Sequence, residues 1–393
     1  MAVIVRSLGF DILDYIDDFV SVRQELKYYG ISRTVLTVPF NKKYADLFNL
    51  GKSLTGSINP RMIHLEGEEQ DCYMVTDIRV VNDGKSRVME VGCYSMLYIL
   101  NFRVLRNDIE ATDLDIGMLA RNITSNAIGD DSFPERSFGR VINSIRPNLG
   151  YIGSLSLKIG DKVADSLIDF FSEYEYSVRI VPRYSEDTFA LEEYIGTDRT
   201  YTSNNPKIFS DEAENVSNIS FEQDSNNFSN VALMNVYNES DNPTFNYNEI
   251  QFVSIGDVTY RGWSRREFFG NGRDITNKYK PIYNEDEIEL PFSAHAARVR
   301  RDGILQLAEM KEVNNMSATL APEEKFMFNK DFFLGDRVTM VMNEVGVVSN
   351  ERITSVTRVI DKNGENVTIS IGAKDVSFIK SIRKGLRNIG INK

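Results

Sequence analysis

Two segments far apart in the sequence carry the pattern of a β-hairpin. In the first, apolar residues within 80–91 surround the turn sequence Asn82–Gly84, and in the second, those within 353–371 surround Asp361–Gly364. Asparagine, aspartate and glycine tolerate the positive φ angles that tight hairpin turns need. A chain of 393 residues with two such hairpins is expected to be mainly β and to contain two or three domains.

Extended segments account for most of the first hundred residues. Thr34, Leu36 and Val38 alternate along one face of a run that ends at Pro39, because proline lacks the amide that a strand ladder needs. A short helix is expected over 41–50. The sequence therefore predicts a β domain at the start.

Three segments show helical spacing instead: 114–128, 161–175 and 296–313. Asp161 is placed to cap the second helix. The apolar face of this second helix has four members: Val163, Leu167, Ile168 and Phe171. Strand-like residues at 178–181 follow, so an α+β unit is expected to interrupt the β chain.

The stretch from Ile208 to Tyr260 contains no lysine or arginine and is rich in acids. One interpretation is a disordered acidic linker. Apolar residues such as Phe221, Val231 and Leu233 favour the other interpretation, folded edge strands with long loops.

Basic residues return at Arg261, Arg265 and Arg266, around the single tryptophan, Trp263. Aromatic residues near it could form an exposed receptor-binding cluster or pack in a β core. Packing is the preferred interpretation, since aromatic residues are common in strands. The residues concerned are Phe268, Phe269, Tyr279 and Tyr283.

The scarcity of histidine and cysteine limits the covalent chemistry available to the chain. His64 lies in an apolar strand-like run, and His295 precedes the predicted helix without a GxSxG or HExxH motif. Cys72 and Cys93 form no CxxC pair and are too few for a structural zinc site. We expect two buried thiols and two histidines with structural roles.

Other candidate motifs have simpler explanations. Glu192 with Glu193, or Asp130 with Asp131, could cleave a glycoside only if their carboxyl groups stood the right distance apart, and sequence adjacency does not show this. The Gly270–Gly272 tripeptide lacks the strand and helix of a dinucleotide site. Glycine is fourth in the loop from Asp361, whereas an EF-hand needs it sixth. We therefore expect no catalytic residue, no cofactor and no metal.

Short sequences along the whole chain follow the order found in one protein family. They are Glu90–Gly92 with Leu97, Leu100 and Arg103, then Gly196–Thr200, Ile208–Ser210, Asn215, Asn230–Ala232, Arg265–Glu267, Ile304–Ala308, Phe333–Val338 and Arg352–Val356. Together they resemble the tail-hub proteins of long-tailed bacteriophages and phage-derived particles. Leu334–Asp336 precedes an alternating run and has the composition of a turn, since glycine permits a tight bend and aspartate can bond freed amides.

The resemblance implies an α+β, mainly β fold with two β-barrel-like tube domains and an inserted α+β domain, assembled as a trimeric ring. The expected boundaries are 1–108 for the first tube domain, completed by about 184–205; 109–183 for the inserted domain; 206–377 for the second tube-type domain, with a helix near 296–313 and an insert near 243–295; and 378–393 for a basic amphipathic tail.

The function that the resemblance implies is a structural hub at the tail tip or baseplate, made in the host cytoplasm. Its partners would be two further copies, the distal tail or tube ring and the tip or spike protein. DNA would pass as cargo without specific binding, as the net charge of −12 also indicates, and no stable membrane binding is expected. The alternatives are a tail-associated cell-wall hydrolase and a host receptor-binding module.

Two charged segments suggest where such a ring meets its surroundings. Part of the acidic stretch, with Glu212, Glu222 or Asp224 as candidates, is expected to face the lumen and repel DNA, and the arginines at 261–266 to face neighbouring proteins. A solvated outer loop is the other interpretation of the acids. Residues 378–393 are expected either to dock on an acidic partner or to form a frayed tail.

Overall fold

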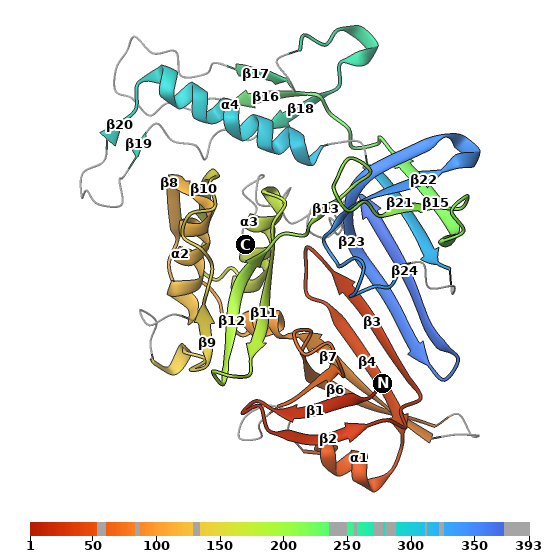
Figure 1. Cartoon of the computed structure of the whole chain (residues 1–393). Coiled ribbons are helices and arrows are strands. Elements are labelled where there is room, and N and C mark those ends of the chain that lie inside the picture. Colours follow the sequence, from red (N-terminus) through yellow and green to blue (C-terminus); the bar gives the residue numbers. More distant parts are fainter. Residues whose placement is uncertain are drawn as a thin grey trace. The chain divides into compact units, whose positions relative to one another are not determined.

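The computed structural model describes residues 1–52, 60–82, 87–128, 134–235, 250–254, 258–270, 278–279, 288–310, 313–321 and 326–372 (Figure 1). The fold is α+β and mainly β, as predicted, with few helices. The chain forms two compact units. Unit 1 comprises Met1–Ser220 and Met316–Lys374, and unit 2 contains Phe221–Asn315. The 378–393 tail lies outside the described residues.

One large sheet dominates unit 1. Its paired strands follow the order β15 (Val216–Asp224), β21 (Val313–Leu320), β24 (Gly364–Gly372), β23 (Val347–Asp361), β3 (Ser21–Lys27), β4 (Arg33–Pro39), β7 (Arg87–Ser95), β6 (Tyr73–Asn82), β5 (Arg61–Leu65), β1 (Val3–Ser7) and β2 (Ile12–Ile16). Strands β13 (Asp198–Arg199) and β14 (Ile208–Ser210) pair with β22 (Arg337–Met342), which pairs with β23. The two ends of the path do not pair with each other, so the described strands form an open sheet and not a closed barrel.

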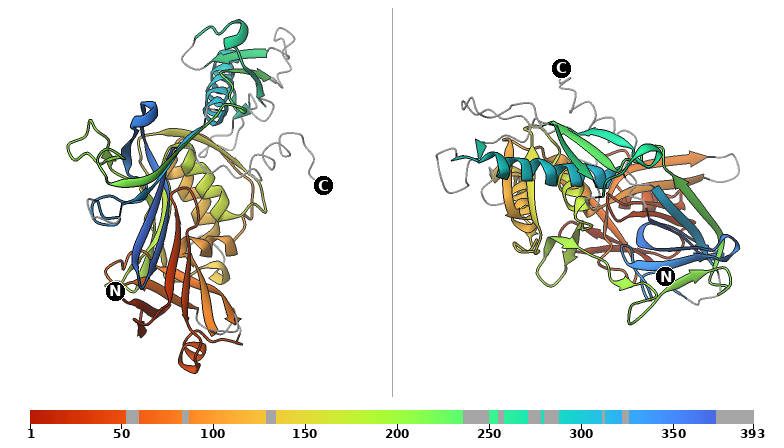
Figure 2. Two further views of the ribbon diagram at one scale, coloured as in Figure 1. Left: turned by 90° about the vertical axis from the view of Figure 1, so that its right-hand side faces the viewer. Right: turned by 90° about the horizontal axis from the view of Figure 1, so that it is seen from above.

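Strands from the N-terminal and C-terminal β regions of the chain pair with each other inside this sheet. β23 pairs with β3 in antiparallel register from Ser355 opposite Lys27 to Asp361 opposite Ser21. Figure 2 shows the hairpin of β23 and β24 (blue) beside β3 (red). Segments that the sequence suggested as separate β regions therefore share one hydrogen-bonded sheet.

Both predicted hairpins are confirmed as strand pairs. β6 pairs with β7, although residues 83–86 of their turn lie outside the described residues. β23 and β24 are joined by a two-residue turn between Asp361 and Gly364. Thr34, Leu36 and Val38 are buried on one face of β4, as their alternation predicts. The short helix is α1 (Lys42–Leu47), whose first turn is capped by Asn41.

An α+β segment follows these strands. It comprises β8 (Ile109–Asp115), α2 (Ile116–Ile128), β9 (Val141–Asn143), β10 (Ile152–Leu157), α3 (Val163–Glu173), β11 (Ser177–Arg183) and β12 (Thr188–Tyr194). The predicted apolar face of α3 is buried. The first helix begins two residues later than predicted, because residues 114 and 115 pair with β10. Asp161 does not cap α3: its carboxylate accepts the amide of Lys158, and the N-cap is Lys162.

Unit 2 is a small sheet covered by one helix. β16 (Val231–Asn235) lies between β17 (Ile250–Ser254) and β18 (Glu267–Gly270), and α4 (Phe292–Glu309) packs on them. These strands and β15 confirm folded strands in the acidic stretch. A Cβ added at Gly303 would lie 2.9 Å from Met234 Cγ, which explains a glycine inside the helix. Two short strands, β19 (Lys278–Tyr279) and β20 (Ile288–Glu289), pair with each other.

The prediction of a helix over 296–313 was wrong at both ends. The helix begins at Phe292, and Pro291 before it is the N-cap residue, with the extended backbone that N-cap residues adopt. It ends at Glu309, and Val313 begins β21. His295 therefore lies inside the helix and not before it. No helix in the described part of the chain is long and apolar enough to cross a membrane.

Candidate functional site

His64 is a buried structural residue of β5. Arg6 Nε donates to its Nε2 over 3.0 Å, while Nδ1 lies 3.0 Å from the carbonyl of Leu65. This arrangement requires the neutral ring with its proton on Nδ1. Burial lowers the pKa of His64, because it disfavours the charged ring. Both nitrogens are occupied, so the ring is not placed as a general base.

His295 and the two cysteines are also enclosed. The His295 side chain is fully buried in α4, and both thiols are buried and unpaired by disulfide. Burial raises the pKa of Cys72 to about 12 and that of Cys93 well above its ordinary value. Because the thiolate is the reactive form, neither cysteine has the properties of a nucleophile. The predicted buried thiols are confirmed.

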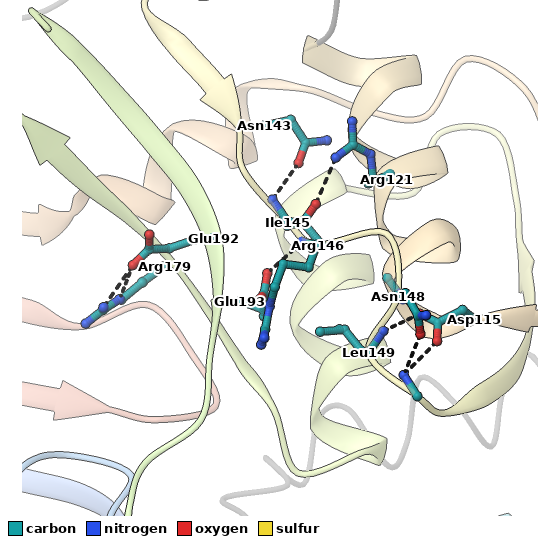
Figure 3. Close-up of polar contacts among 12 residues, drawn as sticks. Asp115, Arg121, Asn143, Ile145, Arg146, Asn148, Leu149, Arg179, Glu192 and Glu193 are labelled. Carbon is teal, nitrogen blue, oxygen red and sulfur yellow. Dashed lines mark hydrogen bonds and ion pairs between the residues drawn. The ribbon is translucent and has the colours of Figure 1, made fainter.

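Glu192 and Glu193 point to opposite sides of β12 and bind different arginines (Figure 3). Arg179 Nη2 lies 2.8 Å from Glu192, and Arg146 binds Glu193. These ion pairs give both acids a structural explanation. The Asp130–Asp131 pair lies outside the described residues.

The loop that carries Arg146 is held by further polar contacts. Asp115 accepts the backbone amides of Leu149 and Gly150, each over 2.8 Å, and Arg121 donates to the carbonyl of Ile145 (Figure 3). These bonds fix the connection between β9 and β10. They satisfy backbone groups of the loop.

No group of three histidine, cysteine, aspartate or glutamate side chains in the described ranges is placed to hold a metal ion. The Asp361 carboxylate, suggested as part of a calcium-like loop, accepts the amide of Asn363 over 2.7 Å within the hairpin turn. Gly270 ends β18, and the rest of its tripeptide lies outside the described residues.

Three of the segments that carry the family resemblance meet at one buried junction: Gly196–Thr200, Phe333–Val338 and Arg352–Val356. Asp336 accepts the amide of Thr197 and the Nε of Arg199, each over 2.7 Å. A Cβ at Gly196 would lie 2.0 Å from the carbonyl oxygen of Gly335, so only glycine fits there. Arg352 closes the junction by donating to that same carbonyl over 2.6 Å. The predicted turn role of Asp336 is confirmed, and the junction locks β13 against β22.

The aromatic residues around Trp263 were expected to pack in a core, and most of those described do not. Phe268 is half-buried against the core of unit 2, but Phe269 is exposed and Trp263 is fully exposed. Nothing is described for the side chains of Tyr279 and Tyr283. Sequence composition gave no signal for this exposure, because it depends on how the loop before β18 leaves the sheet.

Unit 1 contains an open apolar hollow of about 520 Å³. It was not predicted, because its lining combines Tyr201 and Ile208 with the β22–β23 hairpin, which is more than a hundred residues further along the chain. The lining residues are Tyr201, Ile208, Thr339, Val341, Val348 and Asn350. None of the six lining residues is charged or a histidine.

This arrangement of strands and helices defines a fold shared with phage tail proteins. The tail protein from Neisseria meningitidis MC58 has a TM-score of 0.58 at 12% identity, over 95% of this chain and 97% of that one. The prophage MuSo2 43 kDa tail protein from Shewanella oneidensis gives 0.53 at 10%, over 94% and 98%. A prophage tail protein from Listeria monocytogenes EGD-e gives 0.53 at 11%, over 99% and 100%.

Family membership follows from the sequence itself. The family of Siphovirus ReqiPepy6 Gp37-like proteins matches residues 3–373, and the chain belongs to that family. Among curated proteins, none matches this sequence. The predicted resemblance to phage tail proteins is confirmed.

Proposed function

We propose that this chain is a structural hub protein of a phage or phage-derived tail, where three copies form a ring that continues the tail tube. The observation that carries the proposal is the fold shared with three tail proteins over at least 94% of this chain and 97% of each of theirs. Neither side has a large unmatched part, so the likeness concerns the whole architecture.

The open sheet supports assembly with other chains. β2 ends the path of paired strands, and its Ile12, Leu13 and Tyr15 are exposed. An edge strand with exposed apolar side chains invites a partner, because its backbone groups and its side chains are both uncovered. In a ring of three copies, the N- and C-terminal β regions of each copy would supply the six tube segments, and neighbouring copies would complete barrel-like walls.

The acidic surface agrees with a passage for DNA. Three copies carry a formal net charge of about −36, three times −12. Glu222 and Asp224 lie on edge strand β15, Glu222 exposed and Asp224 half-buried, and Glu212 beside β14 is exposed. We assign Glu222 and Asp224 to the lumen side, where they would repel the phosphate backbone.

The hydrolase alternative is less well supported by the described side chains. A cell-wall hydrolase needs two converging carboxyl groups, and Glu192 and Glu193 are engaged by separate arginines. We expect purified protein to leave peptidoglycan intact. Turnover that a single acid substitution abolishes would instead establish the hydrolase.

Imaging of assembled particles tests the proposal. A label on this chain should mark a threefold ring at the tip end of the tail tube, next to the distal tube ring and the tip or spike protein. A ring of any other symmetry, or a position elsewhere in the particle, would contradict the hub.

A further inference from the structure

Trp263 projects from unit 2 without any cover from its own surroundings. It lies in the 3-10 turn η4 (Gly262–Ser264), where Gly262 has a φ of +56°, and its side chain is fully exposed. Val258 and Phe269 nearby in the sequence are exposed too. Tryptophan can bury more area than any other side chain, so a fully exposed tryptophan with two exposed apolar residues close to it in sequence is a candidate for contact with another molecule.

The charge around this tryptophan is positive. Three arginines and one glutamate occur within 261–267. Arg265 binds Glu267, and Arg266 donates to the carbonyl of Ser225 over 2.8 Å, which holds their side chains beside the turn. The exposed indole therefore has a basic border.

The apolar hollow of unit 1 is concave, whereas the Trp263 side chain projects. Thr339 and Val341 of β22 stand opposite Asn350 and Val348 of β23, so the four share a patch of sheet, and Ile208 of β14 pairs with Thr339 from the other side. Its volume of about 520 Å³ falls within the range of sites that admit small molecules, which leaves room for an indole. Val348 is 56% exposed, so part of the lining faces water.

Three acids lie at the tip of the β22–β23 hairpin, just beyond Val341 and Val348, the lining pair nearest the tip. Asn343 Nδ2 donates to Asp211 over 3.0 Å and to Glu212 over 3.2 Å, and Glu344 follows it at the tip. All three acids are exposed. The hairpin tip next to the hollow thus carries acids, whereas the turn that holds Trp263 carries arginines.

We propose that Trp263 of one copy inserts into the hollow of the next copy, which rests on the proposed ring and specifies how its copies join. The two surfaces differ in shape and in charge, so the contact is head-to-tail and not self-complementary. A head-to-tail contact repeated around a rotation axis closes into a ring, and threefold closure uses each surface once per copy. The arginines at 261–266 meet the acids at 211, 212 and 344.

Fluorescence gives a direct readout, because Trp263 is the only tryptophan. On trimer formation by the purified chain, its emission should shift to shorter wavelength. Trp263→Ser should weaken self-association at least tenfold, as expected for a central aromatic anchor. Ile159→Ser removes an exposed apolar side chain that belongs to neither proposed surface, and it should change neither the association nor the emission.

Disulfide cross-linking in assembled particles identifies the partner surface. Particles that contain a mixture of the Trp263→Cys and Val348→Cys chains should form a disulfide between two chains, whereas either variant alone should form none. A chain with both substitutions should give covalent trimers. The native Cys72 and Cys93 are buried and do not compete.

Each other outcome overturns the contact. Trp263→Cys alone forming dimers would mean a twofold contact, and a link within one chain would mean that the hollow takes its own tryptophan. No link between the mixed chains, or an emission shift with cell-wall glycan but not with trimer formation, would assign Trp263 to another partner. If imaging shows the threefold ring while these tests fail, the proposed hub function is retained and only the Trp263 contact is rejected.

Discussion

Arg199 and Asp336 form a buried ion pair, with 2.7 Å between Nε and Oδ2 and side chains only 14% and 2% exposed. Asp336 also accepts the amides of Thr197 and Phe333. A single carboxylate therefore ties together two chain segments that are more than a hundred residues apart. Its loss would leave a buried cation and two backbone amides without their acceptor.

We predict that Asp336→Ala lowers the free energy of unfolding by about 3–5 kcal/mol, the usual cost of removing one partner of a buried pair. Glu25→Ala removes an acid from the exposed pair with Arg23 and should cost less than about 1 kcal/mol. Urea unfolding of both variants measures the difference. Equal costs would show that the junction adds no stability.

Gly335 should be intolerant of any side chain. Its φ is +90°, and an added Cβ would lie 2.3 Å from the ring of buried Tyr28. Gly160 has nearly the same φ, +89°, with nothing within 4 Å of an added Cβ. Gly335→Ala should therefore destabilise the fold by about 1–3 kcal/mol more than Gly160→Ala, because only the first adds overpacking to backbone strain. Thermal unfolding of the pair separates the two effects.

The contribution of His64 to stability should fall as the pH drops below about 6.5. His64 has a lowered pKa in the folded chain, so below its ordinary value the unfolded chain binds a proton that the folded chain does not. The loss continues down to the folded pKa. His64→Gln can still accept from Arg6 and should reduce this part of the pH dependence. Denaturation curves between pH 7 and 5 give the comparison, and unchanged slopes would contradict it.

Both cysteines should resist thiol reagents in the native protein. Their thiols are buried and their pKa values are raised, so the thiolate is scarce at neutral pH. A chromogenic disulfide reagent should react with neither in buffer and with both in denaturant. Rapid native labelling of either thiol would show that its surroundings open readily.

Deletion of residues 378–393 should leave the subunit folded, because β24 ends at Gly372. The segment has five basic residues and no acid, so its removal should weaken attachment to an acidic neighbouring tail component. Circular dichroism measures the fold, and co-purification measures the attachment. Full attachment after deletion would favour the frayed-tail interpretation.

Local patterns predicted the strands well because their causes are local. Alternation gave β4, turn residues gave both hairpins, and the apolar face gave α3. The predicted helix ends were less accurate, because other hydrogen-bond partners compete for the terminal residues. Residues 114 and 115 pair with a strand, and the Asp161 carboxylate accepts the amide of Lys158.

Contacts between segments that are distant in the sequence could not be predicted from it. The motif at 334–336 was recognisable as a turn, but nothing near it indicated Gly196 and Arg199 as its partners. The hollow is formed by residues that come together only when the strands pair. The exposure of Trp263 depends on the path of the turn that carries it. Composition indicates which side chains are available and does not show which of them a fold leaves uncovered.

The pairing of β3 with β23 also has a consequence for synthesis. β3 leaves the ribosome early, but the strand that completes one of its edges is among the last to be made. Until then, β3 presents unpaired backbone groups along that edge, which can recruit wrong partners. Folding of the large sheet therefore finishes only after translation has passed β23. A host that makes many copies at once must keep nascent chains apart during this interval.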